Sequence, residues 1–449
     1  MKNKFPNYFK VMLRAFVLLW QNKSARKISF FAIAFSLTSF LHAQDPMVYV
    51  YRPHWPHAKN NFRNSISFSG EYTAGSNGLT NSFINSLYKG DFLDSATKAN
   101  QENQMHPSNR VGGYASYSVA YTWRNNPDST KWEFTIAYRD REALSGEFSS
   151  DAFKLGFEGN RPFLGKTADL SNTQMTLMHW QQIQFETKYY SEDNRSEIAL
   201  GVSILNGQQM QGANIRTGSV YTEPSANYID VNNFFASYYR SDTAKTSFGN
   251  RNGAGSSFNF RFSTVLGDSG SPFQHQLSFM VQDIGFITWN DKSQVYNVDT
   301  TVHYTGVNAS DVVLNGGHVT GLPNSDSLIG KPKSERIYQP LPLGLRFRYS
   351  LITPWPVWGG VDIRAWNYSA GNTAKQISIF AGWHSNDFRL SMTGGAAYGG
   401  FARLQFPLQV AYEISKYFSF TLGTTNLAAY LAPKKSYGQG LYLNLSVAF

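Results

Sequence analysis

Apolar and polar residues alternate along most of the chain beyond residue 63. In the segment 65–72, Ile66, Phe68 and Tyr72 fall on one side of an extended chain, and three serines and a glutamate fall on the other. A period of two is typical of a β-sheet with one face in an apolar medium and the other in a polar one. The pattern therefore predicts an all-β protein.

The same alternation recurs to the end of the chain. Residues 132–139 place Trp132, Phe134, Ile136 and Tyr138 opposite Glu133, Thr135, Ala137 and Arg139. Further alternating segments lie at 183–190, 197–204, 257–266, 275–281, 343–351, 360–368, 403–414, 418–425 and 440–449. Turn-forming clusters such as 124–131 and 191–196 separate neighbouring segments, as in hairpins. Counting the segments predicts about fourteen strands.

Two architectures produce this pattern, a soluble β-sandwich and a membrane β-barrel. The segments run to ~10 residues, as tilted membrane strands do, whereas soluble strands average ~5–6. Their polar faces carry charges of both signs, such as Glu186 with Lys188 and Arg403 with Glu413. Such charges are costly in a sandwich core and acceptable in a wet lumen. We therefore expect residues 64–449 to form a transmembrane antiparallel β-barrel.

The last ten residues are an alternating strand that ends in Phe449. In it Leu441, Leu443, Leu445 and Val447 fall on the predicted lipid face with Phe449. The segment resembles the C-terminal signal that the barrel-assembly machinery reads in bacterial outer-membrane proteins. A final strand must also pair with the first, because an unpaired backbone edge is not tolerated in hydrocarbon.

Residues 1–43 have the features of an export signal. Three basic residues precede the apolar stretch 28–40, and a small-residue site ends at Ala43. A membrane anchor is the alternative, but this stretch is shorter than the ~20 residues that a spanning helix needs. We expect export to the outer membrane, with 44–63 as a periplasmic lead-in.

Composition narrows the chemistry further. The chain has no cysteine, which excludes thiol nucleophiles, disulfides and cysteine-based metal sites. Seven basic residues precede the first acidic one, and without them the formal charge falls from +10 to +3. The remainder is not polycationic, so nucleic acid is not an expected partner. No pattern in the sequence predicts a cofactor.

Long polar stretches separate some of the strands, notably 75–110, 142–179 and 291–336. Outer-membrane barrels have short turns on the periplasmic side and long loops outside. We therefore expect these stretches to be extracellular loops. The segment 159–165 is rich in glycine and proline, and we expect it to fold into the lumen as a partial plug.

Motifs that suggest catalysis or metal binding have simpler explanations. The sequence 267–272 copies a serine-protease nucleophile turn at Ser269, but it lies between two strands, where a hairpin turn is needed. His54 and His57 are separated by a proline and lack a third ligand nearby. The glycines of 392–400 are not followed by the lysine of a nucleotide-binding loop. We expect no enzyme activity.

Charged residues on two neighbouring predicted strands form the best candidate for a lumen site. Arg346, Arg348 and Arg364 accompany a single acid, Asp362. Three guanidinium groups against one carboxylate could hold an anion. The alternative is that these charges cross-link the lumen wall, as interior charges of barrels commonly do.

Three stretches resemble a family of uncharacterised outer-membrane barrels from Bacteroidota, similar in style to the fatty-acid-transporter fold. They are 157–175, 197–210 and 280–291. The matching positions are Gly159, Asn160, Asp283, Gly285, Phe286 and Trp289, whereas 205–207 is shorter and less basic than the family's pattern. The resemblance implies a barrel of roughly fourteen strands. Several relatives serve the type IX secretion and gliding apparatus, and no activity is agreed for the family.

Two functions follow as hypotheses. The first is a non-enzymatic conduit, passive or gated, for small or amphipathic solutes. The second is a structural or adaptor barrel that binds a secretion or gliding component through its loops. In both, the direct surroundings are outer-membrane lipid.

Overall fold

The computed structural model describes residues 63–125, 131–242, 249–268, 270–305, 331–369 and 372–449. The predicted export signal, 1–43, and the lead-in up to residue 62 lie outside the described residues, as do His54, His57 and Ser269. Within the described part, no helix combines the length and apolar character needed to cross a membrane.

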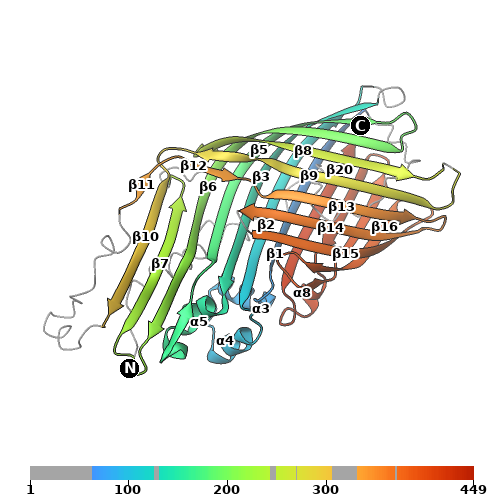
Figure 1. The fold of residues 1–449 in the computed structure, drawn as a ribbon. Helices are drawn as coiled ribbons and strands as arrows, with labels where there is room; N and C mark the ends of the chain where they lie inside the picture. The colour runs from blue at the N-terminus through green and yellow to red at the C-terminus, as the bar shows by residue number, and fades with distance from the viewer. Residues whose placement is uncertain (1–62, 126–130, 243–248, 269, 306–330, 370–371) are drawn as a thin grey trace.

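Fourteen antiparallel strands form a closed barrel, as predicted (Figure 1). In spatial order they are β1 (Asn64–Ser76), β2 (Ser108–Trp123), β3 (Trp132–Ser149), β5 (Thr173–Tyr190), β6 (Ser196–Thr222), β8 (Gly253–Leu266), β9 (Gln274–Trp289), β13 (Leu343–Ile352), β14 (Val357–Ser369), β15 (Asn372–His384), β16 (Leu390–Gly399), β18 (Leu408–Ser415), β19 (Phe418–Thr424) and β20 (Gly438–Ala448). Each pairs with its neighbours in this order, and β20 pairs with β1.

The last strand closes the barrel. The β1–β20 ladder runs from the pair Ser65 and Ala448 to the pair Gly75 and Gly438. Beyond it, the backbone N–H of Asn64 donates to Phe449 O at 3.0 Å, and Phe449 N–H donates to Asn64 O at 2.9 Å. The closure leaves neither edge of the first and last strands unpaired, as a membrane barrel requires.

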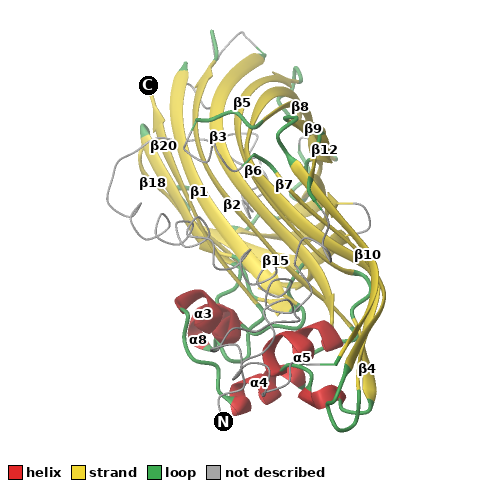
Figure 2. Ribbon diagram, turned by 90° about the vertical axis from the view of Figure 1, so that its left-hand side faces the viewer, coloured by secondary structure: helices red, strands yellow, loops and turns green. Residues whose placement is uncertain are grey.

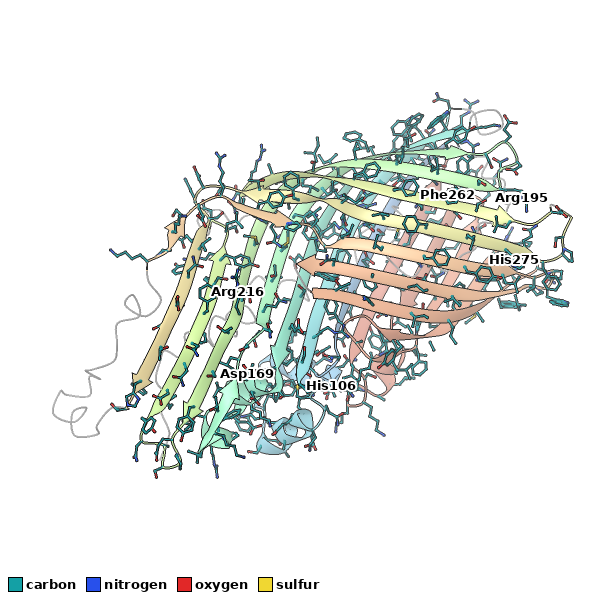
Figure 3. The ribbon with its side chains drawn as sticks, viewed as in Figure 1. His106, Asp169, Arg195, Arg216, Phe262 and His275 are labelled. Carbon is teal, nitrogen blue, oxygen red and sulfur yellow. The ribbon has the colours of Figure 1, made fainter. Side chains whose placement is uncertain are left out.

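Side chains alternate between the two faces of the wall as predicted. Ile183, Phe185, Ile204 and Ile379 are exposed on the outer face, and Figure 3 shows Phe262 on the same face. The intervening positions point inward and are mostly serine, threonine, glutamine, asparagine or arginine, and many of them are buried. An apolar exterior around a polar interior is the arrangement of a barrel that spans the outer membrane.

The two ends of the barrel differ. Short turns join β5 to β6, β8 to β9, β13 to β14, β15 to β16 and β18 to β19, all at the end that holds Asn64 and Phe449. The long connections lie at the opposite end, together with the helices (Figure 2). Outer-membrane barrels keep their long connections outside the cell. This end is therefore extracellular.

Four helices lie at the extracellular end, and the three longer ones begin at side-chain caps. They are α3 (Asn81–Lys89), α4 (Ser95–Glu102), α5 (Ser150–Glu158) and the short α8 (Ala428–Leu431). Asp94 accepts a hydrogen bond from Thr97 N at 2.7 Å, and Ser149 accepts one from Ala152 N at 3.0 Å. Such caps satisfy N–H groups that the first helical turn leaves unpaired. Parts of the stretches predicted to be loops are therefore ordered helices.

Strand β6 is longer than the barrel wall. Up to Gly207 it pairs with β8, and from Gln211 onward it pairs with β7 (Ile229–Arg240) instead. Strand β10 (Gln294–Tyr304) pairs with β7, and β4 (Lys166–Asp169) pairs with the end of β6. These strands continue the wall beyond the barrel (Figure 1). We call β4, β7, β10 and residues 211–222 of β6 the extension sheet.

The predicted plug does not enter the lumen. The segment 159–165 includes the short helix η2 (Arg161–Phe163), which follows α5. Phe163 packs with Leu155 and Leu170 against Val220 and Phe234 of the extension sheet. Its apolar side chain is thus buried outside the barrel, on a sheet that the sequence did not reveal.

Candidate functional site

Paired charges line the periplasmic half of the lumen. Lys188 Nζ of β5 lies 2.8 Å from Glu133 Oε1 of β3, and Arg261 Nη2 of β8 lies 3.0 Å from Glu186 Oε1. All four side chains are mostly buried. Because each charge has a partner on a nearby strand, this part of the wall is cross-linked and electrically balanced.

The three predicted arginines converge on Asp362. Arg346 Nη2 lies 2.6 Å from Asp362 Oδ2, Arg348 Nε lies 3.0 Å from the same oxygen, and Arg364 Nε lies 2.8 Å from Oδ1. The carboxylate is fully buried, and Arg348 is the most exposed of the arginines at 13%. All three arginines thus pair with one carboxylate, as the cross-linking alternative expects. The anion role therefore stays a prediction.

A bidentate ion pair crosses the middle of the lumen. Arg141 of β3 donates from Nη1 to Asp283 Oδ1 of β9 at 2.9 Å, and its Nη2 lies 2.9 Å from Oδ2. The guanidinium also donates to Tyr114 Oη at 2.6 Å and to Gln182 Oε1 at 2.8 Å. It lies over the rings of Tyr114 and Trp180. Both charged side chains are at most 3% exposed, so this pair is held on all sides.

A bulge in β9 aims Asp283 inward. Asp283 has a φ of 62°, and the register between β8 and β9 shifts between Phe258 and Phe260. The backbone N–H of Asp283 donates to Asn259 Oδ1 at 2.7 Å, which holds the bulge. A bulge lets two consecutive residues share one face. Gln282 and Asp283 consequently both reach the interior, which simple alternation does not predict.

Above this ion pair lies a buried apolar cluster, which we call the neck. The neck cluster contains Met178, Trp180, Leu205, Met210, Ile287, Trp289 and Leu341, none more than 2% exposed. Gly285 makes this packing possible, because a Cβ there would lie 2.2 Å from Ser256 O. Two of the family positions thus have physical roles: Gly285 brings β9 close to β8, and Trp289 fills the neck.

The connection between β16 and β18 covers the neck from the extracellular side. It includes β17 (Leu404–Gln405) and carries Phe401, whose ring centroid lies 4.9 Å from that of Tyr368. Arg403 donates from Nε to Asn77 O and from Nη2 to Gln104 O, each at 2.6 Å. The prediction that Arg403 lies on the polar face of a strand is wrong, because β17 begins only at Leu404. Its side chain instead anchors this connection to the residues around α3 and α4.

A small cavity lies between the ion pair and Phe401. Its volume is about 80 Å³. Aromatic and charged side chains line it, chiefly Glu71, Tyr114, Arg141, Trp180, Asp283, Arg364, Trp366, Tyr368 and Phe401. Within the described part of the chain, the Trp180 indole N–H has no hydrogen-bond partner. Buried groups of this kind are normally satisfied, so this level of the lumen has unused capacity for a polar ligand.

The other residues singled out in the sequence lie away from this cavity. Gly159 ends α5 with a φ of 79°, and Asn160 begins the short helix that follows. Residues flanking Ser269 form the β8–β9 turn at the periplasmic end. The glycine-rich 392–400 is mainly strand β16, a wall element. Phe449 lies beyond the end of β20, beside Asn64.

Several solved structures resemble this chain at low similarity. The toluene transporter TodX of Pseudomonas putida is 9% identical, with a TM-score of 0.42, covering 86% of this chain and 90% of that one. A FadL homologue of Pseudomonas aeruginosa is 10% identical, with a TM-score of 0.41 and coverage of 86% and 90%. At these values the likeness concerns the fold alone. No protein of curated function matches the sequence significantly.

A family model described as a family of unknown function, DUF5723, matches residues 57–425. The match covers the end of the lead-in and every barrel strand except β20, including Asp283, Gly285 and Trp289 of the lumen. It confirms the resemblance to an uncharacterised barrel family. The chain belongs to DUF5723.

Proposed function

We propose that this barrel is a gated conduit for small amphipathic solutes, and that the structure is its closed state. The observation that supports this most directly is the mid-lumen cavity, which combines aromatic rings with paired charges. Ligand sites typically join apolar walls to a few well-placed polar groups. If the lumen side chains served only to cross-link the wall, the ion pairs would be needed but the cavity would not.

The chemistry of the lining favours an amphipathic solute. Trp366, Tyr368 and Phe401 provide flat apolar surfaces, while Arg141 and Arg364 supply guanidinium groups on other sides of the same space. A small aromatic solute with a polar end matches both, since its ring packs on the aromatic side chains and its polar end meets the charged and hydrogen-bonding groups of the lining.

The dimensions require a gate. The cavity measures about 80 Å³, whereas a cavity of ~150 Å³ is needed to bind benzene. An aromatic solute therefore enters only if part of the lining moves. Phe401 is the natural moving part, because a connection carries it and the residues before it, Gly399 and Gly400, have φ values of 100° and 70°.

Uptake into liposomes tests this proposal, with phenylacetate as the probe. We expect slow uptake through the parent barrel and faster uptake through Phe401→Ala, which removes the ring over the cavity. Gly112→Ala should also speed uptake, because a Cβ there would lie 2.3 Å from the Phe401 ring and displace the ring. The control is Phe406→Ala, on the same connection but exposed at its surface.

The outcomes separate clearly. Uptake by the control should match the parent. If Phe401→Ala and Gly112→Ala take up the probe no faster than protein-free liposomes do, the conduit is contradicted. Parent uptake as fast as that of Phe401→Ala contradicts the gate.

An adaptor role is the second candidate. The extension sheet and the helices place a large ordered surface outside the membrane, beyond what a conduit requires (Figure 2). A secretion or gliding component that binds this surface would co-purify with the barrel in mild detergent. Stable co-purification combined with no uptake in any variant favours the adaptor over the conduit.

A further inference from the structure

The two faces of the extension sheet differ in what covers them. On one face, Val220, Phe234 and Ala236 are buried under Leu155 and Phe163. The other face holds six side chains that we call the tip track: Arg216, Tyr221, Tyr228, Asp230, Phe235 and His303. Figure 3 shows Arg216 on this part of β6, away from the barrel. All six are exposed or half-buried in the described structure.

Three rings meet at the outermost end of the track, contributed by β6, β10 and the turn before β7. The centroids of Tyr221 and Tyr228 lie 6.2 Å apart, and those of Tyr228 and His303 lie 4.9 Å apart. Asp230 lies opposite both Tyr221 and His303 in the ladders, and its Oδ1 is 2.5 Å from His303 Nδ1. A carboxylate thus lies beside a row of tilted rings.

Bulges shape the middle of the track. The register of β6 shifts on either side of Thr217, and that of β10 shifts between Thr300 and Val302. Asn233 has a φ of 48°, and its carbonyl accepts a hydrogen bond from Thr217 Oγ1 at 3.0 Å. Bulges re-aim side chains and are common beside binding sites. Here they place the Arg216 guanidinium 5.4 Å from the centre of the Phe235 ring.

The track continues toward the lumen. Tyr239 of β7 lies opposite Gly212 of β6 and packs against the neck cluster. The exposed rings at the tip therefore share one surface with the apolar neck. A molecule held on the tip track is held at the entrance of the barrel.

The composition of the track selects the partner. Asp230 offsets Arg216 within the track, and Asp299 lies opposite Phe235 beside it, so the track lacks the basic surplus that a polyphosphate needs. The rings are separated by polar groups, so the track is not one apolar patch of the kind that docks an apolar surface. A peptide added by strand pairing would use a sheet edge instead of a face.

We propose that the tip track binds soluble neutral oligosaccharides. Sugar rings have apolar C–H faces that pack on aromatic rings, and their hydroxyls both donate and accept hydrogen bonds. Asp230 and His303 are placed to receive and supply such bonds beside Tyr228. The proposal concerns binding outside the barrel and does not rest on conduction through it.

Calorimetry tests this assignment. The full barrel in detergent is titrated with a linear hexasaccharide of glucose and, separately, with one of N-acetylglucosamine. We expect at least one of these probes to bind. Tyr228→Ala removes a stacking ring and His303→Ala removes the polar ring. Each should raise the dissociation constant of the bound saccharide by roughly fivefold or more. Tyr88→Ala, an exposed tyrosine on α3, is the control and should leave affinity unchanged.

Each variant is checked for correct folding by electrophoresis in denaturing detergent without heating, where a folded barrel stays folded. The proposal is overturned if neither hexasaccharide binds, or if both track variants bind as tightly as the parent. Binding only to vesicles that contain lipopolysaccharide, with none to free saccharide, also overturns it. Failure of solute uptake leaves it intact, because the two measurements are independent.

Discussion

At the scale of single residues, the ion pair between Arg141 and Asp283 has the greatest effect on the lumen. The sequence placed Arg139 on the inward face, and Arg141 has the same phase. It gave no sign that Arg141 meets Asp283, because the two are 142 positions apart and Asp283 turns inward only through a bulge. The one available signal was an Asp–x–Gly step inside an apolar strand, a place where bulges are common.

Removing the carboxylate leaves Arg141 charged and buried. We expect Asp283→Asn to destabilise the barrel by about 3–5 kcal/mol, because the loss of one partner of a buried pair leaves the other uncompensated. Chemical denaturation in detergent micelles measures this. The double variant Arg141→Met, Asp283→Leu should recover part of the loss. A single variant as stable as the parent would show that the pair is not buried.

The arginines around Asp362 permit a second test. If they hold an anion, sulfate should raise the melting temperature of the parent more than chloride at equal ionic strength. Arg348→Gln should reduce this difference, since Arg348 is the most exposed member of the cluster. Arg389→Gln, on an exposed periplasmic turn, serves as the control. Equal sulfate effects in the parent and in Arg348→Gln would remove the anion role.

At the scale of elements, period-two alternation located most of the barrel strands but missed β15 and β16, and it did not show which strands are neighbours. Residues 211–222 of β6 alternate much as the barrel strands do, so the sequence could not show that they leave the wall. Strand β10 lies in the stretch 291–336, and the prediction of a loop there is wrong for 294–304. The same gap explains the failed plug prediction. Phe163 needed an apolar surface, and the sequence offered only the lumen as a candidate.

The closing strand gives the prediction at this scale. Phe449 pairs with Asn64 through two backbone hydrogen bonds and exposes half its ring. We expect Phe449→Ala to lower the amount of folded barrel in the outer membrane severalfold, because the aromatic end is the expected assembly signal. Phe388→Ala, an exposed ring on a turn at the same end, should have no such effect. Equal yields of the two variants would contradict the role of Phe449.

At the scale of the whole molecule, the fold is determined by two environments, lipid outside the wall and a polar interior within it. Outward positions meet lipid and are apolar, while inward positions are polar and pair with one another. The sequence therefore predicted the barrel, its fourteen strands and its long extracellular connections. It could not predict the neck cluster, because that cluster depends on side chains from distant strands meeting at one level.

The proposed conduit and the proposed saccharide site lie along one path through the molecule. The tip track lies outside the membrane, the neck and Phe401 lie at the entrance, and the ion pairs fill the periplasmic half. A solute would meet stacking surfaces first and charges last. Each step uses residues that the family match covers.

The conductance of the unmodified protein in planar lipid bilayers tests the central claim most directly. A lumen closed by its own side chains predicts a silent membrane for most of the recording, with rare brief openings. A large, steady conductance like that of an open porin would contradict the closed lumen and the gate with it.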